Sequence, residues 1–261
     1  MLRYLLGLLL LWNTVILWAT PQTGDYLIYQ GDTLYLETAL PLASTPKMQN
    51  LAQHLSIEGY NTACWRGYYS IWELQNDSLF WRGASSCNDF NKNNWVLKAY
   101  LFAEWINGEI IQPFGQKLHY EHSGLGYYYE FERSYNFLAG RLTNTAVYNN
   151  TAFSKSPYYE NVDSLYNWLM RNVNWSLLDT FDLETLNHTI VASCTCAAEG
   201  KATFQKIYRT HSKAIDKEVI RLIELLPCSV YYRRGQPENR QWSLPFNFAR
   251  LIRYQEQLSE K

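Results

Sequence analysis

The stretch Thr189–Arg209, TIVASCTCAAEGKATFQKIYR, carries the clearest structural signal in the chain. Its first half alternates, so that one face of an extended strand would carry Ile190, Ala192, Cys194 and Cys196. Strict alternation over this length indicates a half-buried β-strand. A turn at Ala198-Glu199-Gly200 follows, and Ala202–Arg209 then runs back as a second strand. We therefore predict a β-hairpin here.

Helical patterns and a further strand surround this hairpin. Before it, apolar residues recur at helical spacing at Val162, Leu165, Tyr166, Leu169 and Val173. After it, a second helical stripe consists of Ile215, Val219, Leu222, Ile223 and Leu226. Pro227 ends this second helix, and Trp242 to Phe248 alternates as a strand. The predicted order is helix, strand, strand, helix, strand.

The first half of the chain shows a different pattern, in which short strands and turns follow one another from Tyr26 to about Thr151. Asn107-Gly108, between apolar residues, is a strong hairpin signal. The one helical candidate, Pro46–Leu55, is short. Dense strands without long helices between them favour an antiparallel barrel or sandwich. The fold class expected for the whole chain is α+β.

Length and composition support two domains. The chain has 261 residues, of which 47% are hydrophobic and 16% aromatic, so it can bury two cores. Asn, Ser and Pro interrupt any periodicity between residues 146 and 159, which places a boundary there. We expect a β-rich domain over residues 21–155, a second domain over 156–250 and a C-terminal tail over 251–261.

The N-terminus indicates export. An apolar run from Leu5 to Trp18 follows Arg3, and small Ala19 lies at its end. This is typical of a signal peptide, expected over residues 1–20. The expected location is therefore periplasmic or secreted. A retained membrane anchor is the alternative, although the run is shorter than the about 20 apolar residues of a spanning helix.

Five cysteines in an oxidising compartment allow two disulfides. We predict one between Cys64 and Cys87. Cys194 and Cys196 would lie on the same face of a strand, so only one of them is expected to bond Cys228. Their spacing does not fit structural zinc sites.

The second half resembles the TonB C-terminal domain family over about residues 161–248. The matching segments are Ala198–Ile207, Ile215–Arg221, Leu226-Pro227, Arg233-Arg234-Gly235 and Leu244–Phe248. The resemblance implies two helices on a three-stranded antiparallel sheet, an edge to which a partner peptide adds a strand, and a link to outer-membrane transport. In this chain Ser229 stands where the family usually has Trp. The N-terminal half, through Thr62–Tyr68 and Trp72, resembles uncharacterised secreted proteins.

Partner binding is the function that the sequence favours. Pro245 has no N–H to donate, which places the last strand at a sheet edge or Pro245 near the end of that strand. The expected partner-binding residues are Trp242, Ser243, Leu244, Pro245 and Asn247. The expected partner is a protein or peptide of the cell envelope. No catalytic, cofactor or metal residues are expected, and the net charge of −1 argues against nucleic acid.

The alternative is a secreted carbohydrate-binding protein or hydrolase with its site in the β-rich domain. Its aromatic residues, including Trp65, Tyr68, Tyr69, Trp72, Trp81 and Trp105, could form a sugar-stacking surface. Rings on pleated strands more often fill a core. His119 and His122 are the only metal-like pair in this half, and on a strand their side chains would point to opposite faces.

Overall fold

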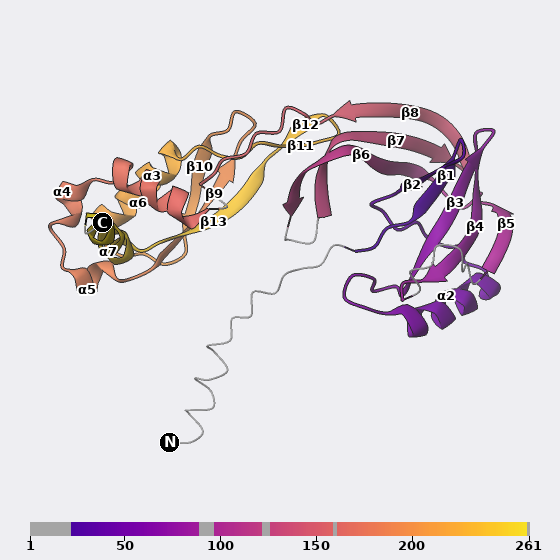
Figure 1. The fold of residues 1–261 in the computed structure, drawn as a ribbon, viewed down its shortest axis with the longest axis horizontal. Coiled ribbons are helices and arrows are strands. Elements are labelled where there is room, and N and C mark those ends of the chain that lie inside the picture. The colour runs from indigo at the N-terminus through magenta and orange to yellow at the C-terminus, as the bar shows by residue number, and fades with distance from the viewer. Residues whose placement is uncertain (1–21, 89–96, 122–125, 159–160, 260–261) are drawn as a thin grey trace, which may run out of the picture. The chain divides into compact units, whose positions relative to one another are not determined.

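The computed structural model describes residues 22–88, 97–121, 126–158 and 161–259 (Figure 1). The chain forms two compact units that divide between Val147 and Tyr148. Strands predominate over helices, so the α+β class is confirmed. The expected signal peptide lies outside the described residues. The boundary expected at residues 155–156 falls within the second unit, where Ser154 and Val230 exchange backbone hydrogen bonds of 3.1 and 2.8 Å.

The N-terminal unit is built on one eight-stranded sheet. Its strands are β1 (Tyr26–Tyr29), β2 (Asp32–Tyr35), β3 (Tyr68–Gln75), β4 (Ser78–Ser86), β5 (Leu97–Phe102), β6 (Gly108–Glu121), β7 (Gly126–Leu138) and β8 (Arg141–Asn149). They follow the order β2-β1-β3-β4-β8-β7-β6, with β5 beside β4. The sheet does not close into a barrel, so the barrel expectation is wrong.

One strand pair also departs from the antiparallel expectation, because β1 and β3 run parallel. Parallel neighbours need a long crossover, and here the connection contains helix α2 (Pro46–Gly59). Thr45 caps this helix by accepting a hydrogen bond from the N–H of Met48, and Pro46 occupies its first turn. The apolar side of α2 packs into the same core as β3 and β4.

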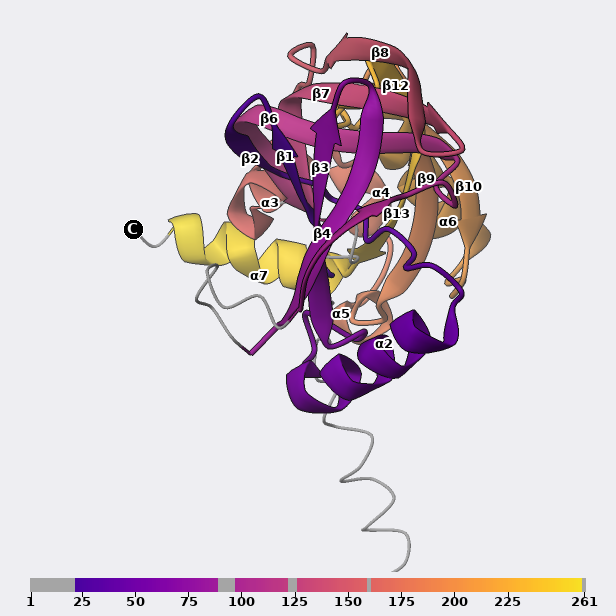
Figure 2. The ribbon, with the colours of Figure 1, turned by 90° about the vertical axis from the view of Figure 1, so that its right-hand side faces the viewer.

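The sheet is curved enough to enclose its own core. Figure 2 shows β6, β7 and β8 running steeply across β3 and β4. Large rings from both groups of strands share one buried cluster, among them Trp72, Trp81, Tyr135 and Phe137. Trp72 and Trp81 also lie opposite each other on β3 and β4. The aromatic content of this half therefore serves mainly as core.

One local expectation in this unit is wrong. Asn107-Gly108 does not turn a hairpin, because β5 pairs with β4 and β6 pairs with β7. The Asn107 side chain instead accepts a hydrogen bond of 2.8 Å from the N–H of Ala139, in the turn between β7 and β8. Asn107, whose local sequence signal predicted a turn, thus makes a long-range contact instead.

The C-terminal unit contains the predicted helices and strands and several more. They are α3 (Val162–Asn172), α4 (Trp175–Leu178), α5 (Leu183–Leu186), β9 (Ile190–Cys196), β10 (Ala202–Ile207), α6 (Lys213–Leu225), β11 (Tyr231–Arg233), β12 (Gln236–Glu238), β13 (Arg240–Phe246) and α7 (Phe248–Ser259). The strand predicted to reach Phe248 ends at Phe246. Residues 251–259, expected in a tail, belong to α7, so the expectation of two helices is also corrected.

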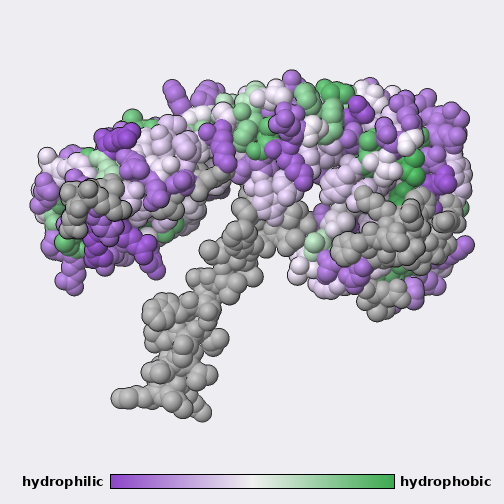
Figure 3. Space-filling view, viewed as in Figure 1, coloured by the Kyte–Doolittle hydropathy of each residue, from purple (hydrophilic) through white to green (hydrophobic). Residues whose placement is uncertain are grey.

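The core of this unit lies between the helices and one face of the sheet. Ser212 caps α6 by accepting a hydrogen bond of 3.2 Å from the N–H of Ile215. The buried stripe of α6 packs with Ile190 and Ala192 of β9 and with residues of α7 in one cluster. On the face shown in Figure 3, the surface of this unit is largely hydrophilic, as expected for helices whose apolar sides face inward.

Two disulfides tie loops to this framework. One joins Cys64 to Cys87, as predicted, and the other joins Cys196 to Cys228. Cys194 is buried and belongs to neither bond. Paired cysteines are typical of proteins that mature in an oxidising compartment outside the cytoplasm. None of the helices in the described ranges is long and apolar enough to cross a membrane.

Candidate partner-binding edge

The candidate site is the outer edge of β13 in the small sheet of the C-terminal unit. This sheet has the order β10-β9-β13 (Figure 1). Antiparallel pairing with β9 runs without a break from Arg240 opposite Cys196 to Phe246 opposite Ile190. Among the described strands, β9 is the only one that pairs with β13. Its other side is therefore a sheet edge.

Hydrogen bonds elsewhere in the sheet show which residues face that edge. The carbonyl of Val191 accepts from the N–H of Tyr208, and the N–H of Ala197 donates to the carbonyl of Lys201. Odd-numbered residues of β9 therefore direct their backbone groups toward β10, and even-numbered residues direct theirs toward β13. Cys194 and its partner Trp242 form a hydrogen-bonded pair on this basis.

It follows that the outward backbone groups of β13 belong to Gln241, Ser243 and Pro245. Pro245 lacks an N–H, and the missing donor would have pointed away from β9. Proline is tolerated on an edge strand for this reason. The open edge thus offers the N–H groups of Gln241 and Ser243 and the carbonyls of all three residues.

Side-chain burial shows which face of the sheet each residue of β13 occupies. Gln241, Ser243 and Pro245 are exposed, whereas Leu244 and Phe246 are buried in the core. Of the predicted partner-binding residues, Ser243 and Pro245 lie at the edge. Leu244 and Trp242 direct their backbone groups inward, and the ring of Trp242 lies 6.3 Å from that of Tyr231.

Asn247 has a structural role that the sequence reading missed. Its side-chain oxygen accepts a hydrogen bond of 2.9 Å from the N–H of Arg250, as a cap at the start of α7. Its amide donates to the carbonyl of Asn187 at 3.2 Å and to the hydroxyl of Thr189 at 3.3 Å. The sequence does contain a signal for α7 that was missed. Asn247, a good capping residue, is followed by Phe248, Leu251 and Ile252 at helical spacing.

The opposite edge, on β10, is less accessible. The pairing of β10 with β9 is irregular between Phe204 and Lys206. Lys201 forms an isolated bridge with Pro227, and the N–H of Cys228 donates to Gly200 at 2.9 Å. Bulges and covering segments are the usual ways of blocking an edge. The two edges therefore differ, and β13 is the more regular one.

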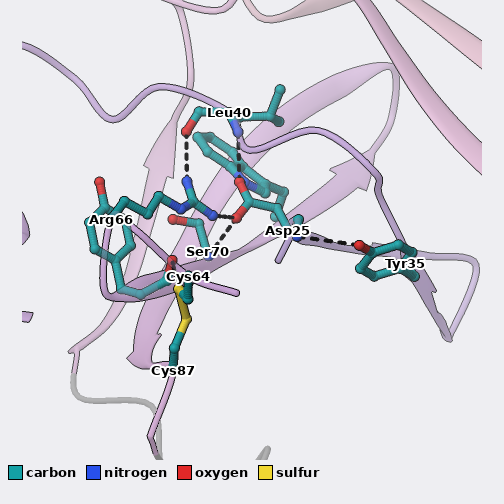
Figure 4. A network of polar contacts seen from close by, with 10 residues as sticks. Asp25, Tyr35, Leu40, Cys64, Arg66, Ser70 and Cys87 are labelled. Atoms are coloured by element: carbon teal, nitrogen blue, oxygen red, sulfur yellow. Dashed lines mark hydrogen bonds and ion pairs between the residues drawn. A yellow bond between two sulfur atoms is a disulfide. The ribbon is translucent and has the colours of Figure 1, made fainter. Parts of the chain in front are cut away.

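The N-terminal unit buries a carboxylate that could be mistaken for a reactive group (Figure 4). One oxygen of Asp25 accepts from the guanidinium of Arg66 and from the N–H of Ser70 at 2.7 Å. The other accepts from the N–H of Leu40 at 2.8 Å and the indole N–H of Trp72 at 2.9 Å. Burial raises the pKa of Asp25, and these donors oppose the rise. With four donors bound, the carboxylate is an anchor.

The remaining metal candidates from the sequence are His119 and His122. His119 lies on β6, with its ring 6.2 Å from that of Tyr128, and His122 lies outside the described residues. Within the described ranges, no cluster of three or more His, Cys, Asp or Glu side chains could hold a metal ion. Burial also raises the pKa of Tyr129 to about 12, so that its hydroxyl stays neutral.

Comparison with known proteins adds no relative from which a function could be transferred. No family model matches the chain, and neither the curated proteins nor the solved structures contain a match. The resemblance of residues 161–248 to the TonB C-terminal domain family therefore stays a prediction from the sequence.

Proposed function

We propose that the C-terminal unit binds an extended segment of a partner protein, which adds as a further strand beside β13. One observation carries the proposal: β13 pairs on a single side among the described strands, while Gln241, Ser243 and Pro245 face outward and are exposed. In this binding mode, main-chain hydrogen bonds supply affinity and alternate side chains supply specificity. The order of helices and strands that resembles the TonB C-terminal domain supports the same mode.

The proposed setting is the cell envelope, in the periplasm or outside the cell. The two disulfides support a compartment outside the cytoplasm, and the N-terminal apolar run supports export. In this setting the protein acts as an interaction protein linked to outer-membrane transport, and its partner is an envelope protein with an extended segment.

The test replaces Ser243 with Pro in the full chain. The variant loses one outward N–H but keeps every hydrogen bond to β9, so the fold should persist. A lost hydrogen bond costs about 1 kcal/mol, which corresponds to roughly fivefold weaker binding. Ser243→Ala is the matched control, because it removes the hydroxyl and keeps the backbone donor.

The partner can be identified with a photoreactive residue at position 243 in cells, followed by affinity measurements with the purified partner. The same residue at exposed Leu225 on α6 is the control position. Cross-links specific to position 243, and weaker binding by Ser243→Pro but not Ser243→Ala, are the expected results. Equal affinity of the folded Ser243→Pro variant would show that this edge is not the binding surface.

A further inference from the structure

Most of the large aromatic residues singled out in the N-terminal unit are buried, but two exposed ones lie close together in sequence. Tyr68, Tyr69, Trp72 and Trp81 are buried. In contrast, Trp65 is 66% exposed and Tyr60 is 63% exposed. Exposed rings of this size need an explanation when two of them lie in one short loop.

The backbone of the loop places these two residues on either side of one turn. Asn61 and Cys64 exchange backbone hydrogen bonds of 3.3 and 3.0 Å, which closes a turn over Thr62 and Ala63. Tyr60 and Trp65 are the next residues outward on the two sides of this turn.

The loop is held at several points. The disulfide from Cys64 to Cys87 fixes its base. The Arg66 guanidinium binds buried Asp25 and also donates to the carbonyl of Leu40 at 3.4 Å. The N–H of Trp65 donates to the side chain of Gln22 at 3.0 Å. A ligand would therefore meet a loop whose backbone is already held in place, which lowers the entropy cost of binding.

The chemistry around the rings is polar and neutral. Asn61 donates through its amide to the side chain of Asn88 at 3.4 Å, and Gln22 donates to the carbonyl of Thr62 at 3.1 Å. Arg66 is the one charged residue from position 60 to 66, and its guanidinium is engaged by Asp25. A surface that binds anionic lipid would instead carry Lys or Arg beside its aromatic residues.

We propose that Tyr60 and Trp65 form a binding surface for a neutral polysaccharide. The rings would stack on the flat apolar faces of pyranose units, and the amides of Asn61 and Asn88 would bond the sugar hydroxyls. Aromatic walls with a few well-placed polar groups are typical of small-ligand sites. The surface lies in the N-terminal unit and is independent of strand addition at β13.

The test uses the oxidised full chain and two neutral probes, cellohexaose and chitohexaose, in calorimetric titrations. Trp65→Ala and Tyr60→Ala should each weaken binding about tenfold or more, because truncating a central ring typically removes over 1 kcal/mol. Both rings are exposed, so the melting temperatures should not change. Tyr208→Ala, at an exposed ring of the C-terminal unit, and Ser243→Pro should bind the sugar like the wild type.

Three results would overturn the proposal. The first is wild-type protein that binds neither oligosaccharide. The second is sugar affinity unchanged by Trp65→Ala. The third is a Trp65→Ala effect seen only with phosphatidylcholine vesicles, which would assign the ring pair to a lipid surface. None of these results bears on the β13 edge, because the partner-binding assay reports that edge separately.

Discussion

Asp25 in the N-terminal unit and Glu218 in the C-terminal unit are both buried carboxylates, and their pKa values are shifted in opposite directions. In the N-terminal unit, Asp25 is fully enclosed, and burial raises its pKa despite four donors. In the C-terminal unit, Glu218 lies on α6 beside Arg221, which is 45% exposed. Burial acts to raise the pKa of Glu218 too, but hydrogen bonds from Arg221 and the N–H of Asn174 outweigh it and lower the pKa.

The difference shows how each unit is assembled. Asp25 joins segments that are far apart in sequence, since its donors belong to Leu40, Arg66, Ser70 and Trp72. Glu218 and Arg221 are neighbours on one helix, and Arg221 also reaches the carbonyl of Asn172 at 2.6 Å. Asp25 holds together separate segments inside the core of the curved sheet. Glu218 instead links helix α6 to the C-terminal end of helix α3.

The largest effect is expected from Phe246→Asp in β13. Phe246 is buried in the core of the C-terminal unit, and losing a buried Phe costs about 3–5 kcal/mol before the unpaired charge is added. The C-terminal unit should therefore unfold. Hydrogen exchange of both units, with Gln241→Asp at an exposed position as control, would measure this. Loss of protection in the N-terminal unit as well would show that the two units do not fold separately.

Asp25→Ala should destabilise the N-terminal unit and leave the C-terminal unit unaffected. It leaves Arg66 without its carboxylate and two backbone N–H groups without acceptors, which typically costs about 3–5 kcal/mol. Asp32→Ala, at an exposed position on β2, is the control. Urea unfolding followed by hydrogen exchange should show the loss in the N-terminal unit alone. A midpoint equal to that of Asp32→Ala would mean that Asp25 is not an anchor.

The contrast between contacts among sequence neighbours and contacts between distant segments also explains what the sequence could predict. Alternation at Ile190–Cys196 and helical spacing from Ile215 to Leu226 are local signals, and the structure confirms the hairpin and the helix they indicate. The turn between β3 and β4 is a local feature of the same kind, because Asn76 and Asp77 adopt positive φ there. Segments whose pattern depends on neighbouring residues were therefore predicted well.

Long-range features were not predictable in this way. The parallel pairing of β1 with β3 and the contact of Asn107 with Ala139 depend on residues far apart in sequence. At the candidate edge, Pro245 indicated an edge strand, but the outward direction of Gln241 and Ser243 follows only from the register with β9. The exposure of Trp65 among so many buried rings depends likewise on the three-dimensional loop.

The smallest effect is expected from Glu218→Gln, which keeps the shape of the side chain and removes its charge. At pH 7 the variant should lose about 1 kcal/mol, because Gln can still accept from the N–H of Asn174 and because solvent screens the half-exposed Arg221. Glu224→Gln, at an exposed position on the same helix, should cost less.

The pH dependence tests the sign of the pKa shift. In the folded state the pKa of Glu218 is lowered from its ordinary value of 4.5, so its charge stabilises the fold above that value. As the pH falls below about 4.5 and through the folded pKa, the unfolded state binds the proton more readily, and this contribution is lost. The stabilities of wild type and Glu218→Gln should therefore converge in acid. Curves that stay parallel from pH 7 to pH 3 would show that the pKa of Glu218 is not shifted by folding. A wild type that gains stability relative to Glu218→Gln as the pH falls would show that burial outweighs Arg221, as it does at Asp25.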